Sequence, residues 1–176
     1  MAEPVRILGI DPGSVTTGWG VVDSDGRNSL HVAHGCIATG AGPLPERLGV
    51  IYRELSLIIA EHAPREMGVE DVFMARNAMS ALKLGQARGA AICAGMSHGL
   101  SVAEYPPRLI KQSIVGTGGA AKEQIQHMVL SLLALGARAV PADAADALAV
   151  ALTHAHARTR PVAAAPPRRR KSVRWR

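Results

Sequence analysis

The sequence predicts an α/β fold: a mixed five-stranded sheet of three antiparallel meander strands plus two parallel strands, covered by helices. Two observations lead there. Three short apolar segments separated by turn signals come first, which is typical of an antiparallel meander. Helical and strand patterns then alternate, which places later strands parallel to the first. The 176 residues are enough for one compact domain and a tail.

The strands are predicted from apolar β-type runs bounded by turn residues. The first run stops at an Asp-Pro-Gly turn, and Ser-Asp-Gly at 24–26 is a hairpin signal between the second and third. The predicted strands are Val5–Asp11, Gly18–Asp23, Leu30–Ile37, Glu66–Val72 and Ser101–Tyr105.

The helices are predicted from apolar residues at helical spacing and from capping residues. Their ranges are Pro45–His62, Asn77–Gly99, Arg108–Val115, Ala120–Leu135 and Pro141–Ala157. The segment 77–99 begins with a plausible cap, Asn77, and is rich in Gly and Ala. Glycine inside a helix costs roughly 1 kcal/mol relative to alanine, so this helix is expected to pack closely against a neighbour.

The net charge of +6 is unevenly distributed along the chain. Residues 158–176 hold eight basic and no acidic residues, while residues 1–157 hold 12 basic and 14 acidic ones. This division predicts a folded domain over 1–157 and a basic, disordered tail over 158–176.

Within the predicted domain, the beginning is acidic and the middle is basic. Residues 1–71 hold five basic and ten acidic groups, whereas 72–138 hold seven basic and two acidic groups. A metal-dependent nuclease needs this combination, because carboxylates collect cations while Lys and Arg hold phosphates. Surface charge that serves solubility would give the same counts.

The chain shows no membrane span and no signal-peptide pattern, and its lone cysteines, Cys36 and Cys93, lack metal-ligand spacing. We therefore expect a cytoplasmic protein without a membrane partner.

Two acids stand at predicted strand ends. Asp11 closes the first strand and Glu70 lies near the end of the fourth. Open α/β sheets place ligand sites at the carboxyl ends of their strands, which favours a metal site. Taken singly, Asp11 fits an ordinary turn equally well, and Glu70 fits an ordinary strand end better.

Two further acids, Asp143 and Asp146, lie three residues apart at the start of the last helix, and therefore on one helix face. Acids at a helix N-terminus also complement its dipole, and Asp143 suits an N-cap. The rest of this helix is almost wholly apolar between 142 and 152, and no basic residue is near in sequence. A divalent cation would supply the missing partner.

As a set, these four carboxylates predict an oxygen-ligand site for Mg²⁺, with Mn²⁺ as a possible substitute. Two such ions, about 4 Å apart, activate water and stabilise the leaving oxygen of a phosphodiester. We expect two ions per active site.

The sequence resembles the RuvC family of Holliday junction resolvases. Six blocks carry the resemblance, in order, over residues 5 to 157: ILGIDPGS (7–14), EDVFMARN (70–77), SALKLGQARG (80–89), KQSIVG (111–116), KEQIQHM (122–128) and ADAADALA (142–149). The resemblance implies a ribonuclease-H-like fold, a homodimer, and Mg²⁺-dependent paired nicks in a four-way DNA junction. It also implies the branch-migration proteins RuvA and RuvB as partners.

The resemblance implies roles for individual residues. The family's catalytic acids match Asp11, Glu70, Asp143 and Asp146, where the third position can be His in the family. Its functional lysines match Lys111, expected near the scissile phosphate, and Lys122; its stacking aromatic matches Phe73.

The residues themselves support these roles unequally. Phe73 fits a core residue as well as a base-stacking one. Lys122 opens a helix, where a cation opposes the dipole, which favours a phosphate-facing role over a solvated one. The predicted DNA-binding set is completed by Arg76, Lys83 and Arg88, which by themselves read as surface charges.

Two other functions compete with a nuclease. An actin- or sugar-kinase-like ATPase also opens on a strand followed by an Asp-x-Gly-Ser turn, but it needs a second related domain. A module that binds junctions without cutting them also fits, although binding gives no reason to gather four carboxylates. The helix 77–99 is the expected dimer interface.

Overall fold

The computed structural model describes residues 3–71, 77–136 and 139–159. It confirms the mixed five-stranded sheet, with strands in the order β3-β2-β1-β4-β5. The strands are β1 Val5–Asp11, β2 Thr16–Ser24, β3 Ser29–Ala38, β4 Glu66–Glu70 and β5 Ser101–Tyr105.

The first three strands form the predicted meander, and the last two run parallel to β1. The β2–β3 turn forms where Ser-Asp-Gly indicated it. There the Asp25 carboxylate accepts hydrogen bonds from the backbone N–H groups of Arg27 and Asn28, at 2.8 and 2.7 Å. An Asp side chain that binds its own following backbone stabilises such a turn.

Five helices complete the described fold: α1 Leu44–His62, α2 Ala78–Ser97, α3 Pro107–Val115, α4 Lys122–Leu132 and α5 Ala142–Thr159. The predicted cap of α2 is confirmed, since the Asn77 side chain accepts hydrogen bonds from the N–H groups of Met79 and Ser80. No helix within the described ranges has the length and hydropathy to cross a membrane.

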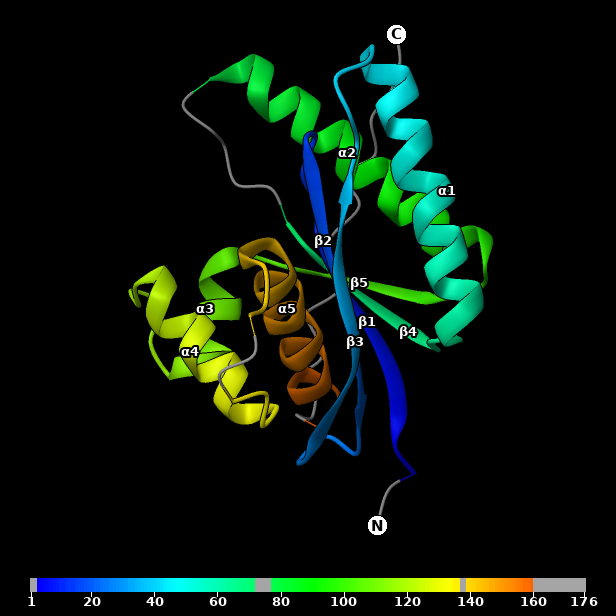
Figure 1. The fold of residues 1–176 in the computed structure, drawn as a ribbon. Helices are drawn as coiled ribbons and strands as arrows, with labels where there is room; N and C mark the ends of the chain where they lie inside the picture. The colour runs from blue at the N-terminus through cyan, green and yellow to red at the C-terminus, as the bar shows by residue number, and fades with distance from the viewer. Residues whose placement is uncertain (1–2, 72–76, 137–138, 160–176) are drawn as a thin grey trace, which may run out of the picture.

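Helices cover both faces of the sheet (Figure 1), with α1 and α2 on one face and α3, α4 and α5 on the other. Side chains alternate along β1 to serve both layers. Ile7 packs in the cluster with α5, whereas Leu8 and Ile10 pack in the cluster with α1 and α2; none of the three is exposed.

Helix α5 lies unusually close to the sheet, because glycines replace side chains beneath it. A Cβ atom at Gly9 of β1 would lie 2.1 Å from the Ala147 carbonyl oxygen. At Gly18 of β2 it would lie 1.9 Å from the Asp143 carbonyl oxygen. Any larger residue at either position would push α5 away, so these glycines set the height of its first turns above β1 and β2.

Some boundaries differ from those predicted. Strand β4 ends at Glu70 rather than reaching residue 72, which lies outside the described residues, and the N–H of Asp71 donates to the Tyr105 carbonyl at 2.9 Å. Helix α4 is shorter than the predicted 120–135.

The glycines of α2 are Gly85, Gly89 and Gly95, and only Gly95 packs closely against another part of the described chain. A Cβ at Gly95 would lie 2.5 Å from the Met67 sulfur. A Cβ at Gly85 or Gly89 would meet nothing within 4 Å in the described part of the chain. For these two positions, the described part of the chain supplies no close neighbour.

Candidate active site

Strand topology brings the four predicted acids to one edge of the sheet. Asp11 and Glu70 are the last residues of β1 and β4, which run in parallel with Ile10 beside Val69. Asp143 and Asp146 lie on the first turns of α5, above Gly18, which is the cross-strand partner of Asp11. Residues more than 130 positions apart in sequence thus meet because two parallel strands end where a helix begins.

The carboxylates form a compact cluster. Oxygen atoms of Asp11, Asp143 and Asp146 all lie within 4.8 Å of one another, and each of these residues is half-buried. Glu70, at the end of β4, lies beside them, and its charge raises the pKa of Asp11.

Burial, together with the nearby carboxylates of Glu70, Asp146 and Asp143, raises the pKa of Asp11 to about 8. Burial also raises the pKa of Glu70, against the opposing effects of Asp11, Lys122 and Lys111. Acids that resist ionisation together in this way are stabilised by an added cation. Since every donor in the cluster is a carboxylate oxygen, the donor set suits a hard divalent cation.

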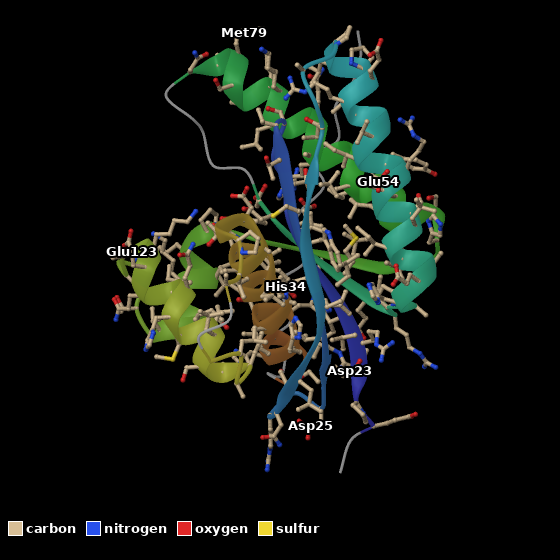
Figure 2. All side chains as sticks on the ribbon, in the orientation of Figure 1. Asp23, Asp25, His34, Glu54, Met79 and Glu123 are labelled. Carbon is tan, nitrogen blue, oxygen red and sulfur yellow. The ribbon has the colours of Figure 1, made fainter. Side chains whose placement is uncertain are left out.

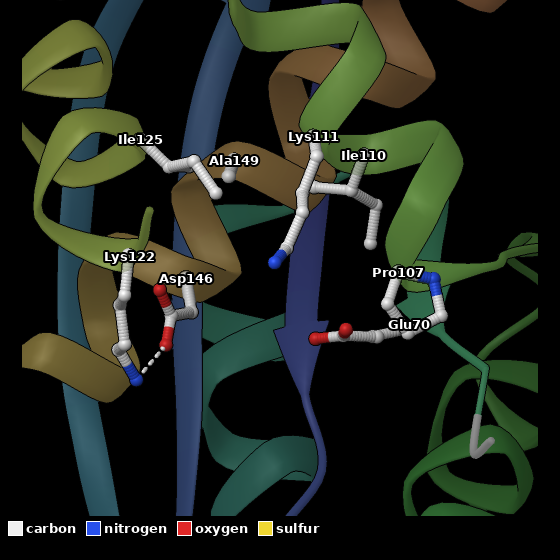
Figure 3. Close-up of a pocket in the computed structure, with 8 residues that line it drawn as sticks. All are labelled: Glu70, Pro107, Ile110, Lys111, Lys122, Ile125, Asp146 and Ala149. Atoms are coloured by element: carbon white, nitrogen blue, oxygen red, sulfur yellow. Dashed lines mark ion pairs between the residues drawn. The ribbon is translucent and has the colours of Figure 1, made fainter. Parts of the chain in front are cut away.

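Two lysines border the acids in a pocket of about 140 Å³ (Figure 3). Its lining residues come from β4, α3, α4 and α5: Glu70, Pro107, Ile110, Lys111, Lys122, Ile125, Asp146 and Ala149. The Lys111 amine donates to the Ala120 carbonyl at 3.3 Å and points between Asp146 and Glu70. This pocket therefore combines negative and positive groups in its lining, as a site for a metal-bound phosphate requires.

Lys122 forms an ion pair with Asp146, with 2.6 Å between Nζ and Oδ2. The hydrogen bond to Asp146 raises the pKa of Lys122. Although no basic residue is near Asp146 in sequence, α4 supplies it with one in the folded chain. Within the described residues, Asp11 and Asp143 form no salt bridge.

The remaining predicted site residues lie apart from this cluster. Lys83 is exposed on α2. Arg88, also on α2, pairs with Asp71 at 3.1 Å and with Glu104 of β5, so its guanidinium already has partners inside the protein. Phe73 and Arg76 lie outside the described residues.

A second group of polar side chains, which the sequence pattern did not single out, lies between α5 and the sheet, further along α5 than the acids. His154 of α5 is only 5% exposed and contacts both Tyr105 and Glu66. Sequence spacing carries no sign of this group, because its members are 49 and 88 positions from His154.

This sheet order, with carboxylates at the ends of β1 and β4 and on α5, defines a ribonuclease-H-like nuclease domain. The family model of crossover junction endodeoxyribonuclease RuvC matches residues 7–154. A protein of that name from Pseudomonas fluorescens is 58% identical over 153 residues, 87% of each chain. One from Pseudomonas aeruginosa is 59% identical over 150 residues, 85% of this chain and 86% of its own. The chain belongs to the RuvC family of crossover junction endodeoxyribonucleases.

Solved structures agree with this assignment. Thermus thermophilus RuvC is 35% identical, with a TM-score of 0.79 over 87% of this chain and 95% of its own. The same protein in complex with a Holliday junction substrate gives 0.82 over 88% and 94%. The yeast mitochondrial Holliday junction resolvase Ydc2, at 9% identity and a TM-score of 0.63 over 88% and 81%, shares the fold.

Proposed function

We propose that this chain resolves four-way (Holliday) DNA junctions by paired symmetric nicks, through divalent-metal-dependent hydrolysis of phosphodiester bonds in DNA recombination and repair. The observation that carries the proposal is the acidic cluster beside a pocket that also holds two lysines. Membership of the crossover junction endodeoxyribonuclease family supports it, and so does the Thermus thermophilus relative in complex with a Holliday junction substrate.

Asp11, Glu70, Asp143 and Asp146 are the proposed metal ligands and catalytic acids, with Mg²⁺ as the cofactor, Mn²⁺ as a substitute and two ions per site. When bound, the cations supply the positive charge that activates water and stabilises the leaving oxygen. The raised pKa of Asp11 supports this assignment, since crowded acids release their proton readily only when a cation arrives.

Lys111 and Lys122 are proposed to hold the DNA backbone. Both line the pocket with Glu70 and Asp146, and Figure 3 shows their amines directed toward these carboxylates. A phosphate held there would face the acids and the lysines together, which orients the bond to be cut. Lys111, the more buried of the two, is proposed to act at the scissile phosphate.

Four more residues complete the proposed DNA surface. Phe73 follows Glu70 by three positions and is proposed to stack on an unpaired base at the junction. Arg76, Lys83 and Arg88 are proposed phosphate contacts. For Arg88 this requires an exchange of its partners Asp71 and Glu104 for phosphate, which makes it the least supported of the set.

A homodimer that uses α2 is part of the proposal. Met79, Leu82 and Met96 are 60%, 61% and 59% exposed along this helix, and Figure 2 shows Met79 at its outer end. Gly85 and Gly89 lie between them with open space where a Cβ would stand. An apolar helix face with helical glycines and no close neighbour in its own chain suits the close approach of a second copy, and a two-fold dimer matches two symmetric cuts.

The proposal extends to the domain layout and to partners. Residues 1–157 would form the nuclease domain, and the basic tail 158–176 would add salt-sensitive DNA affinity. A cytoplasmic location and cooperation with the RuvA and RuvB branch-migration proteins follow from the family resemblance.

A synthetic four-way junction tests the proposal directly. Purified protein with Mg²⁺ or Mn²⁺ should nick two opposing strands at symmetric positions, and EDTA should abolish the nicks. A linear duplex with the sequence of one arm serves as the control and should stay intact. Binding to the junction without nicks in either metal would instead identify a binding module.

A further inference from the structure

Two buried side chains, Tyr105 and His154, and the half-buried Glu66 link α5 to β4 and β5. The Tyr105 hydroxyl lies 2.8 Å from His154 Nδ1, and His154 Nε2 lies 2.7 Å from Glu66 Oε2. Arg158, one turn further along α5, places Nε 2.9 Å from the same oxygen of Glu66. We call Tyr105, His154 and Glu66 the buried polar chain.

Each member of the buried polar chain has a partner of the right kind. Burial raises the pKa of Tyr105, and Glu66 raises it further. The phenol therefore stays protonated, and its O–H donates a hydrogen bond to His154 Nδ1. The other ring nitrogen then carries the hydrogen that is donated to the Glu66 carboxylate. Such a satisfied arrangement is directional, because each hydrogen bond weakens steeply when its groups shift.

The spacing of these contacts matches that of the acids. Asp146 and His154 are eight residues apart on α5, about 12 Å along a helix. Glu66 and Glu70 are four residues apart on β4, about 13 Å along a strand, and their side chains leave the same face. Helix α5 therefore lies antiparallel along β4, with His154 at Glu66 and Asp146 near Glu70.

Between these two contacts the packing is close but not directional. Gly68 lies midway, and a Cβ there would lie 3.2 Å from Val150, 3.3 Å from the His154 Cβ and 3.4 Å from the Tyr105 ring. Van der Waals contacts of this kind hold the helix down on the strand, but they define its position along the strand less sharply than hydrogen bonds do.

We propose that the buried polar chain sets the position of α5 along β4, and thereby the separation of Asp146 from Glu70 in the metal site. Tyr105, His154 and Glu66 are positioning residues, which act through the helix rather than on the cation or the DNA. This inference rests on the proposed metal-binding role of the acids. Its physical basis is that Mg²⁺ demands near-ideal ligand geometry, so a small slide of α5 weakens binding.

Mn²⁺ binding to the DNA-free protein, measured by calorimetry, tests the inference. The variant His154→Phe keeps an aromatic ring and removes both hydrogen bonds. It should raise the Mn²⁺ dissociation constant roughly 3- to 10-fold, less than the 10- to 100-fold typical when a hydrogen bond made directly to a metal ligand is lost, because these residues act on the ligands only through the helix. Junction cleavage by this variant should need proportionally more metal and recover to within about threefold of wild type when metal saturates.

Thr153→Val is the matched control. Thr153 is 2% exposed, and among the described residues its hydroxyl donates only to the Ala149 carbonyl of the same helix, at 2.8 Å. This substitution removes a buried hydrogen bond from the same helix without a link to β4, so the Mn²⁺ constant should equal that of wild type within experimental error.

The possible outcomes distinguish a failure of the positioning role from a failure of the proposed metal site. If both variants lose stability and neither changes Mn²⁺ binding, the buried polar chain is structural only and the inference fails alone. If the wild type binds no Mn²⁺, the proposed metal site fails and the inference with it. If His154→Phe does not fold, Tyr105→Phe removes a single hydroxyl and should still raise the constant about twofold; an unchanged constant overturns the inference.

Discussion

The two ends of the α5–β4 contact bury polar groups in opposite ways. At the Glu66 end, an acid meets a histidine and an arginine, and a tyrosine completes the chain. At the Glu70 end, four acids lie together, and among the described residues they form one ion pair, between Asp146 and Lys122. The first end stabilises the fold as it stands, whereas the second is complementary to added cations. The same helix thus carries a hydrogen-bonded contact with β4 and the proposed metal site, about 12 Å apart.

The largest expected effect is on catalysis at the acid end. Asp143→Asn removes one charge from the cluster while it keeps the size of the side chain. We expect metal-dependent nicking of a four-way junction to fall by roughly 10²- to 10³-fold, the loss typical when a group that stabilises developing charge is removed. Junction affinity in EDTA should be unchanged.

Glu54→Gln is the matched control for this charge change. Glu54 is exposed on α1, on the opposite face of the sheet (Figure 2), and its substitution should leave the nicking rate intact. Equal rates for wild type and Asp143→Asn would remove Asp143 from the site.

The next effect is a loss of stability at the paired end. Glu66→Leu leaves His154 and Arg158 without their carboxylate acceptor, which should cost about 1–3 kcal/mol of unfolding free energy. Denaturant unfolding measures it, with Glu61→Leu as the control, because the Glu61 side chain is 75% exposed. If Glu66→Leu unfolds with the same free energy as the wild type, the contacts of Glu66 with His154 and Arg158 do not stabilise the fold.

At the acid end, removing a carboxyl group should raise the unfolding free energy rather than lower it. The folded pKa of Asp11, about 8, lies above the value of about 4 expected for an unfolded Asp. The stability contributed by protonated Asp11 is therefore complete below pH 4 and is lost as the pH rises through 8. Asp11→Asn should stabilise the metal-free protein at pH 8 by roughly 1–3 kcal/mol, and by less at pH 5.

Thermal unfolding in EDTA at several pH values checks this sign. In the wild type, Mg²⁺ should raise the melting temperature more at pH 8 than at pH 6, because binding then displaces fewer protons. A destabilised Asp11→Asn variant at pH 8, or a Mg²⁺ effect that is independent of pH, would contradict the assignment.

The smallest expected effect concerns the ion pair at the acid end. Lys122→Met frees Asp146 from its partner, so the DNA-free variant should bind Mn²⁺ about two- to fivefold more tightly, as expected for an exposed pair worth less than about 1 kcal/mol. Lys111→Met is the control for charge alone, since the Lys111 amine contacts a carbonyl rather than a carboxylate. Equal changes in the two variants would show that the pair itself does not compete with the metal.

Much of the fold could be predicted, because it depends on local patterns. The apolar runs, the Ser-Asp-Gly turn and the Asn77 cap are each decided by a few neighbouring residues, and the structure shows all of them. The end of β4 was misplaced by two residues, since an apolar run does not reveal where strand pairing stops.

The candidate site could be predicted only in part. Acids at strand ends and on one helix face are visible in sequence, and the topology brings them together. The partners of Asp146 and Arg88 were not visible, because α4 and β5 reach them only after the chain has folded.

By itself, the sequence determined the α/β class, the antiparallel meander of the first three strands, and the four acids as a set, since these depend on short-range patterns and family motifs. Only the tertiary structure decided how those acids are held. Gly9 and Gly18 allow α5 to pack closely against the sheet. Glu66 and His154, which are 88 residues apart in sequence, form a hydrogen bond. Hydrogen bonds and close contacts between distant segments depend on three-dimensional distances of a few ångströms, which no local pattern in the chain encodes.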